Sequence, residues 1–201
     1  MISLPLLVAV PAGALLVRAA MRWRSDDADR RDDDSTDETS GGAGFGVLSF
    51  PYSEVGPEFI DPALGGISGA YGWPYYWGKG SPSTPWSKGP EGVDCSGFVC
   101  MALVKLGTIP STTGDLSSRA IADRCDPVEV GQQRPGDVAY YPGHIMLVVG
   151  YPDDDYDGHS AVMGASGGRN GTFGTDPNAR VKVFPAGDYR SDFVTYGRWR
   201  G

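Results

Sequence analysis

The chain has 201 residues and a net charge of −8, and 40% of its residues are hydrophobic. This length predicts one globular domain with an appended segment, and the acidic balance excludes a basic nucleic-acid-binding face. Three cysteines exclude a disulfide-rich scaffold, and no metal-ligand spacing, phosphate loop or dinucleotide motif is present, so no cofactor or metal is expected.

Residues 1–24 open with an uncharged apolar run and end with Arg18, Arg22 and Arg24. Their length fits a signal peptide or a membrane anchor, so we expect membrane contact through this segment. The basic residues follow the apolar run, whereas an export signal carries them first. A hydrophobic helix docked in a larger assembly is therefore the alternative.

Residues 25–44 are acidic, then polar and glycine-rich. Residues 25–38 alone hold eight acids against two arginines. Such a segment has little to bury and is expected to be a disordered, self-repelling linker. The folded domain is predicted at residues 45–201.

A loop rich in aromatic residues, glycine and proline occupies residues 69–94, and a helix is predicted at residues 95–106. The helical sequence, CSGFVCMALVKL, is apolar on nearly all sides and stops before Gly107. We expect this helix to be buried.

The sequence changes to strand-like alternation after this helix. The stretch at 137–141 leads into a strand at 143–151, where His144, Met146 and Val148 share one face. Further strands are predicted at 159–166, 180–184 and 192–200. Short connections imply an antiparallel sheet, and the order of helix before sheet indicates an α+β fold.

Cys95 is the candidate nucleophile. Asp94 stands where a helix N-cap belongs, so Cys95 is expected at the first helical position, where the helix dipole lowers a thiol pKa. Backbone N–H groups of that turn are suited to an oxyanion hole. Cys100 lies mid-helix and is expected in the core, whereas Cys125, among acidic neighbours, is predicted to be a packed or surface thiol.

A cysteine nucleophile needs a base, and the chain has two histidines. His144 opens an apolar strand and is the candidate general base, with a hydrogen-bonded structural histidine as the alternative. His159 lies beside the acidic stretch at 151–158 and is predicted to be a surface residue.

Four motifs in order resemble the NlpC/P60 family of papain-like cysteine peptidases, which are cell-wall hydrolases. They are PYYWGKGSP at 74–82, GVDCSGFV at 92–99, RPGDVAYY at 134–141 and GHIMLVVG at 143–150. The resemblance implies a papain-like fold in which the buried nucleophile helix packs on an antiparallel sheet of about four to six strands.

The resemblance also implies roles for individual residues. Cys95 corresponds to the nucleophile and His144 to the base, while Tyr75 corresponds to an active-site tyrosine near the oxyanion. Asp94 and Ser96 correspond to residues that shape the substrate pocket. The family's third polar residue, which orients the histidine, falls at Gly164, which has no side chain; Ser166, a backbone carbonyl or water is expected to replace it.

The resemblance therefore implies a peptidoglycan endopeptidase that cleaves amide bonds of stem peptides through an acyl-enzyme, and with residues 1–24 it implies a protein of the cell envelope, anchored or secreted. The alternative is a non-catalytic wall-binding or structural component, for example of a phage tail or injection machine. That reading uses the aromatic loop for binding, although three of the five aromatic residues at 73, 75, 76, 77 and 86 could instead cap the core.

Overall fold

The computed structural model describes residues 52–167 and 176–201. The apolar segment predicted at 1–24, the acidic linker predicted at 25–44 and the domain boundary predicted at residue 45 lie outside these residues. Within the described part of the chain, no helix is both long enough and apolar enough to cross a membrane.

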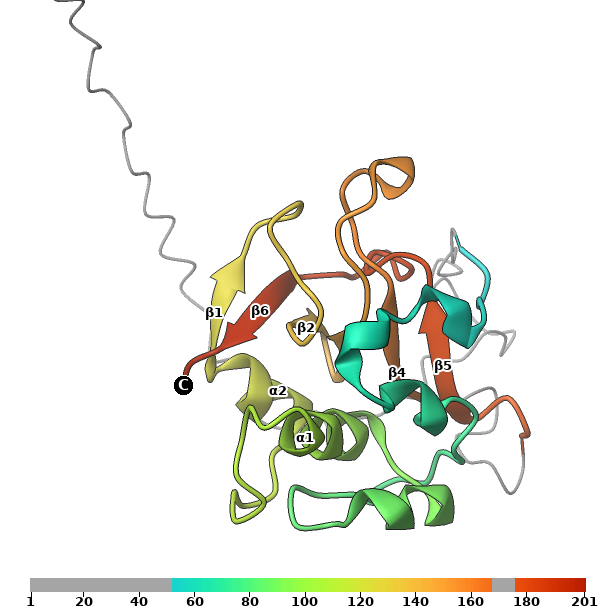
Figure 1. Ribbon diagram of the computed structural model, residues 1–201, viewed down its shortest axis with the longest axis vertical. Coiled ribbons are helices and arrows are strands. Elements are labelled where there is room, and N and C mark those ends of the chain that lie inside the picture. Colours follow the sequence, from blue (N-terminus) through green and yellow to red (C-terminus); the bar gives the residue numbers. More distant parts are fainter. Residues whose placement is uncertain (1–51, 168–175) are drawn as a thin grey trace, which may run out of the picture. The chain divides into compact units, whose positions relative to one another are not determined.

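Helices come first along the described chain and strands follow, which confirms the α+β class (Figure 1). The short 3-10 helices are η1 Pro57–Phe59, η2 Pro62–Leu64, η3 Ile67–Ala70, η4 Trp86–Glu91 and η5 Asp154–Tyr156. The α-helices are α1 Cys95–Lys105 and α2 Ser118–Ala122. The strands are β1 Cys125–Val128, β2 Val138–Tyr141, β3 His144–Val148, β4 Val162–Ser166, β5 Arg180–Phe184 and β6 Thr195–Trp199.

The six strands form one antiparallel sheet in the order β1-β6-β2-β3-β4-β5. Four of them, β3 to β6, lie within the four stretches predicted as strands, and β2 lies in the stretch at 137–141 that was expected to lead into the strand at 143–151. The sequence analysis did not predict β1, because Pro127 and the neighbouring Asp126 are residue types that are uncommon in strands. Proline is tolerated there because β1 is an edge strand, where one side of the backbone needs no partner.

The two faces of the sheet belong to two separate cores. Ile145, Leu147 and Val149 pack into a large core together with α1 and α2. Met146 and Val148 point the other way, into a smaller core that contains Tyr141, Tyr189 and Tyr196. This division confirms the alternation predicted for β3.

The apolar helix is buried, as predicted. Asp94 is its N-cap, and the helix ends at Lys105, shortly before Gly107, whose φ of +72° is left-handed. α1 packs against β3 and β4 on the sheet face that belongs to the large core, so its first turn lies on that face.

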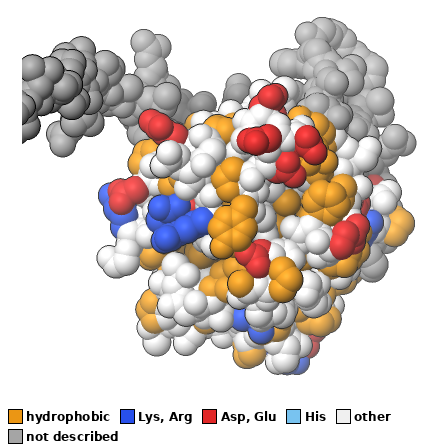
Figure 2. All heavy atoms as spheres, turned by 45° about the horizontal axis from the view of Figure 1, so that its top comes forward, with side chains coloured by type: hydrophobic (Ala, Val, Ile, Leu, Met, Phe, Trp, Pro, Cys, Tyr) orange, Lys and Arg blue, Asp and Glu red, His pale blue; other side chains and the backbone are white. Residues whose placement is uncertain are grey.

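The turn between β3 and β4 carries η5 and four exposed aspartates, Asp153, Asp154, Asp155 and Asp157. It projects at the top of Figure 1. On the face shown in Figure 2, several carboxylates lie close together at the top among apolar side chains, and the largest group of basic side chains lies at the left, with others at the edges.

Candidate active site

Cys95 is the first residue of α1 and is 5% exposed. Asp94 caps this turn: its Oδ1 accepts the Gly97 N–H at 2.6 Å and the Ser96 hydroxyl at 3.1 Å. The cap satisfies one of the N–H groups that a helix leaves unpaired at its start. The thiol therefore lies at the positive end of the helix dipole, where the sequence placed it.

Asp94 also ties the aromatic loop to this turn. Its Oδ2 accepts the Gly78 N–H at 2.9 Å, and its own N–H donates to the Lys79 carbonyl at 2.8 Å. A Cβ at Gly97 would lie 2.2 Å from the Lys79 carbonyl oxygen and 2.8 Å from that of Gly80. Only glycine at position 97 permits this approach, so residues 78–80 lie directly beside the first turn of α1.

Tyr75 reaches the same place through a backbone bridge. It pairs with Val93, two residues before Cys95, and its N–H donates to the Ala179 carbonyl at 2.9 Å. The side chain is 1% exposed. The structure therefore brings Tyr75, Asp94, Cys95 and Ser96 together at one end of α1.

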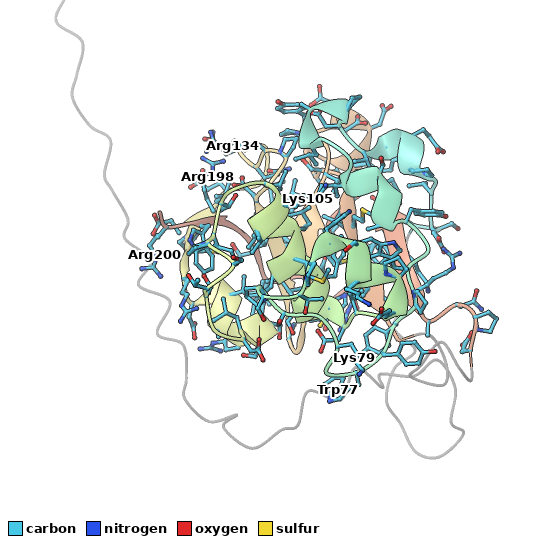
Figure 3. All side chains as sticks on the ribbon, turned by 60° about the horizontal axis from the view of Figure 1, so that its bottom comes forward. Trp77, Lys79, Lys105, Arg134, Arg198 and Arg200 are labelled. Carbon is cyan, nitrogen blue, oxygen red and sulfur yellow. The ribbon has the colours of Figure 1, made fainter. Side chains whose placement is uncertain are left out.

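The aromatic residues of the loop divide between core and surface. Trp73 and Tyr75 belong to the large core, and Trp86 packs against it, 4.6 Å from Trp73 between ring centroids. Trp77 is 54% exposed and stands at the edge of the molecule near Lys79 (Figure 3). Three of the five aromatic residues thus serve the core, and Trp77 is open to a ligand.

The other two thiols are packed away from solvent. Burial raises the pKa of Cys100 to about 12, with the nearby charge of Asp94 adding to the effect. Burial likewise raises the pKa of Cys125 to about 12, and its thiol donates to the Ile121 carbonyl at 3.3 Å. Cys100 is packed as predicted, and Cys125, predicted to be a packed or surface thiol, is packed. Neither is suited to be a nucleophile at neutral pH.

His144 is the first residue of β3 and is 1% exposed. Burial, and secondarily the positive charge of Arg190, lowers its pKa well below the usual value. It pairs with Tyr141 across β2 and β3, on the sheet face of the smaller core, whereas α1 covers the opposite face.

Met146 fills the space beside Gly164, which is the position expected for the residue that orients the base. A Cβ there would lie 2.9 Å from Cγ and 3.1 Å from Cε of Met146. The β3–β4 register pairs Leu147 with Met163, and its continuation brings His144 opposite Ser166. Ser166 as the orienting residue stays a prediction.

The expectation that His159 is a surface residue was wrong. Its side chain is 12% exposed, its Nδ1 lies 2.9 Å from the Tyr196 hydroxyl, and its Nε2 lies 3.8 Å from Asp188. Phe193 packs edge-on against its ring at 5.4 Å. These partners come from the C-terminal part of the chain, so the local acidic sequence around His159 gave no sign of them.

Comparison with known proteins gives one family and several solved structures. Residues 72–169 match the model of the NlpC/P60 family. No curated protein sequence matches the chain.

Among the described residues, no group of three or more His, Cys, Asp or Glu side chains is arranged to hold a metal ion.

Five similar solved structures have sequences 14% to 24% identical to this chain. The peptidoglycan hydrolase RipB of Mycobacterium tuberculosis is 24% identical, with a TM-score of 0.46 over 71% of this chain and 63% of RipB, less than two thirds of its length. The P60 domain of antigen MAP1204 from M. avium subspecies paratuberculosis is 21% identical, with a TM-score of 0.46 over 71% of this chain and 93% of that domain. RipD of M. tuberculosis, described as a non-catalytic NlpC/p60 protein adapted to peptidoglycan binding, is 21% identical, with a TM-score of 0.44 over 67% of this chain and 90% of RipD.

Proposed function

Residues 72–169 of the chain form an NlpC/P60 domain, and from this premise we propose that the protein cleaves amide bonds in peptidoglycan stem peptides through Cys95. The observation that carries the proposal is the capped first turn of α1, with Cys95 at its first residue and Asp94 fastening the aromatic loop beside it. A thiol at this place is favoured as thiolate, the form that attacks a carbonyl.

In the reaction that we propose, His144 takes the proton of the Cys95 thiol as Sγ attacks the amide carbonyl carbon. The oxyanion that forms is stabilised by N–H groups at the start of α1. His144 then gives its proton to the leaving amine, and the C–N bond breaks to leave a thioester on Cys95. Water, deprotonated by His144, hydrolyses this thioester and restores the thiol.

We assign the remaining predicted residues to substrate binding. Tyr75 lies near the reacting carbonyl, while Asp94 and Ser96 shape the pocket at the first turn. The hydrogen bonds of Asp94 to Gly78 and Gly97 also give it a structural task, which is to hold the loop in register with the helix.

We place the protein in the cell envelope, because peptidoglycan is found there and residues 1–24 have the composition of an export signal or anchor. The alternative of a virion or injection-machine component has no support among the proteins compared.

A second candidate function is wall binding without cleavage. Gly164 favours it, since the position that orients the base carries no side chain and Met146 fills the adjacent space. The exposed Trp77 offers an aromatic surface for a wall fragment.

Digestion of purified peptidoglycan separates the two candidates. We expect the protein to release new free amino groups and soluble muropeptides, and Cys95→Ala to abolish the release while leaving wall binding intact. Cys100→Ala is the matched control, because this thiol is in the same helix but packed in the core. Binding by the wild type with no release of amino groups would favour the second function and refute the first.

A further inference from the structure

The space around His144 is enclosed by groups other than a third catalytic side chain. We propose that Tyr141 and the loop of residues 185–194, which joins β5 to β6, position the imidazole of His144 where Gly164 contributes nothing. This inference rests on the proposed role of His144 as the base. It makes Tyr141 and Arg190 positioning residues, since they act through His144 and not on the substrate.

Tyr141 meets His144 directly. The two residues pair across the β2–β3 hairpin, so their side chains stand on the same face of the sheet. Their ring centroids lie 5.7 Å apart with the planes inclined by 42°, and both residues are at most 1% exposed. The phenol ring thus limits the rotation of the imidazole from the β2 side.

The 185–194 loop in turn holds the Tyr141 ring. Its hydroxyl donates to the Gly187 carbonyl oxygen, and Tyr189 and Phe193 pack edge-on at 5.4 Å and 5.8 Å between ring centroids. Burial raises the pKa of Tyr141 well above its usual value, so the hydroxyl stays a donor at any working pH. With contacts on its rim and at its hydroxyl, the ring has little freedom to move.

Arg190 packs over the face of the Tyr141 ring. Its Cζ lies 5.4 Å from the Tyr141 ring centroid, and its guanidinium donates to both carboxylate oxygens of Asp192 at 2.9 Å and 2.7 Å. The side chain is only 9% exposed. A paired guanidinium held in this way gives a fixed positive charge near His144.

The positive charge of Arg190 and the burial of His144 both lower the pKa of His144. Both disfavour the imidazolium, so His144 is held neutral, which is the form required of a general base. The titratable or charged groups around this site are Tyr141 on β2 and Tyr189, Arg190 and Asp192 on the loop. On β5, Arg180 and Lys182 pair with Ser166 and Gly164 and so stand on the same face of the sheet, and Cys95 is the titratable residue at the start of α1.

The pH dependence of kcat/KM tests the arrangement in the full-length protein. In Arg190→Met the positive charge is lost, so we expect the acid limb of the profile to move to higher pH. Arg190→Lys keeps the charge and is expected to keep the acid limb. A merely structural role would lower kcat/KM equally at every pH, and that result for Arg190→Met would overturn the electrostatic part of the proposal.

Tyr141 is tested by two graded substitutions. Tyr141→Phe removes only the bond to Gly187, and we expect a several-fold loss in kcat, up to about tenfold. Tyr141→Leu removes the ring contact, and we expect a loss of about 10- to 100-fold in kcat, with KM little changed. If Tyr141→Leu fails to fold, Tyr141→Phe still decides. Unchanged kcat in folded variants overturns the positioning role.

An NMR titration separates failure of this inference from failure of the proposed function. The chain has two histidines, so the imidazole signals of His144 are assigned by comparison with His159→Gln. We expect the apparent pKa of His144 to rise in Arg190→Met even if the wild type cleaves no peptidoglycan. An unaltered His144 titration in that variant contradicts the inference, whatever the activity.

Discussion

Met146 occupies the space in front of Gly164, so that a Cβ at residue 164 would lie 2.9 Å from Cγ of Met146. We predict that Gly164→Ala lowers the free energy of unfolding by about 1 to 3 kcal/mol, the usual effect of overpacking a core. The measurement is urea unfolding.

The matched experiment combines Gly164→Ala with Met146→Ala. Because the second substitution removes the atoms that meet the new methyl group, the double variant should lose less stability than the sum of the two single variants. Strict additivity of the two effects would show that Met146 does not close the position.

Gly97→Ala tests the contact between α1 and the loop at residues 78–80. Alanine is normally a better helix former than glycine. Here, however, the new Cβ would lie 2.2 Å and 2.8 Å from the backbone oxygens of Lys79 and Gly80, which cannot move away by a side-chain rotation. We predict a loss of about 3 kcal/mol in the free energy of unfolding, together with loss of activity.

Gly114→Ala is the control for that prediction, because Gly114 is exposed and a Cβ there meets nothing within 4 Å. Its free energy of unfolding should change by no more than about 1 kcal/mol, and in the stabilising direction. Equal effects of the two substitutions would argue against a specific contact at Gly97.

Reactivity should distinguish the three thiols. At pH 8 a thiol with a pKa of about 12, such as Cys100 or Cys125, has a thiolate fraction on the order of 10⁻⁴. We predict that iodoacetamide modifies Cys95 first, and peptide mass spectrometry at timed intervals measures the order. Labelling of all three at one rate would count against Cys95 as an activated nucleophile.

Because the thiols of Cys100 and Cys125 are buried, we predict that the folded protein loses stability at alkaline pH. In the unfolded chain each thiol ionises near pH 9, whereas in the folded protein it ionises near pH 12. The unfolded state therefore binds fewer protons between these values, and stability falls as pH rises through this window, by up to about 1.4 kcal/mol per pH unit for each thiol.

Urea unfolding at pH 7, 9 and 10 checks this slope. Cys100→Ala lowers stability at every pH through the cavity that it leaves, but its stability should fall less steeply with pH than that of the wild type. An identical slope would mean that Cys100 does not contribute to the alkaline transition.

The helix and most of the sheet were predictable because their signals are local. Asp94 before an apolar run specifies the start of α1, and alternation specifies the faces of β3. β1 carried no such signal, since Pro127 interrupts a strand of four residues. Five-residue α2 was too short to show a helical period.

The candidate site was only partly predictable. The absence of a side chain at Gly164 is visible in the sequence, but its occupation by Met146 depends on cross-strand packing. Tyr141 was missed, although a usable signal existed: Pro142 and Gly143 form a two-residue connection, and such a hairpin places Tyr141 opposite His144. The contacts of the 185–194 loop depend on irregular backbone, which no periodicity reveals.

The position of β6 has a consequence for how the protein is made. This strand is the last of the six described strands, yet it lies inside the sheet between β1 and β2. During synthesis, residues up to the end of β5 can collapse, but β1 cannot pair with β6 until residues 195–199 leave the ribosome. A nascent chain therefore cannot complete its sheet, and the proposed cell-wall cleavage should arise only after β6 has emerged and paired.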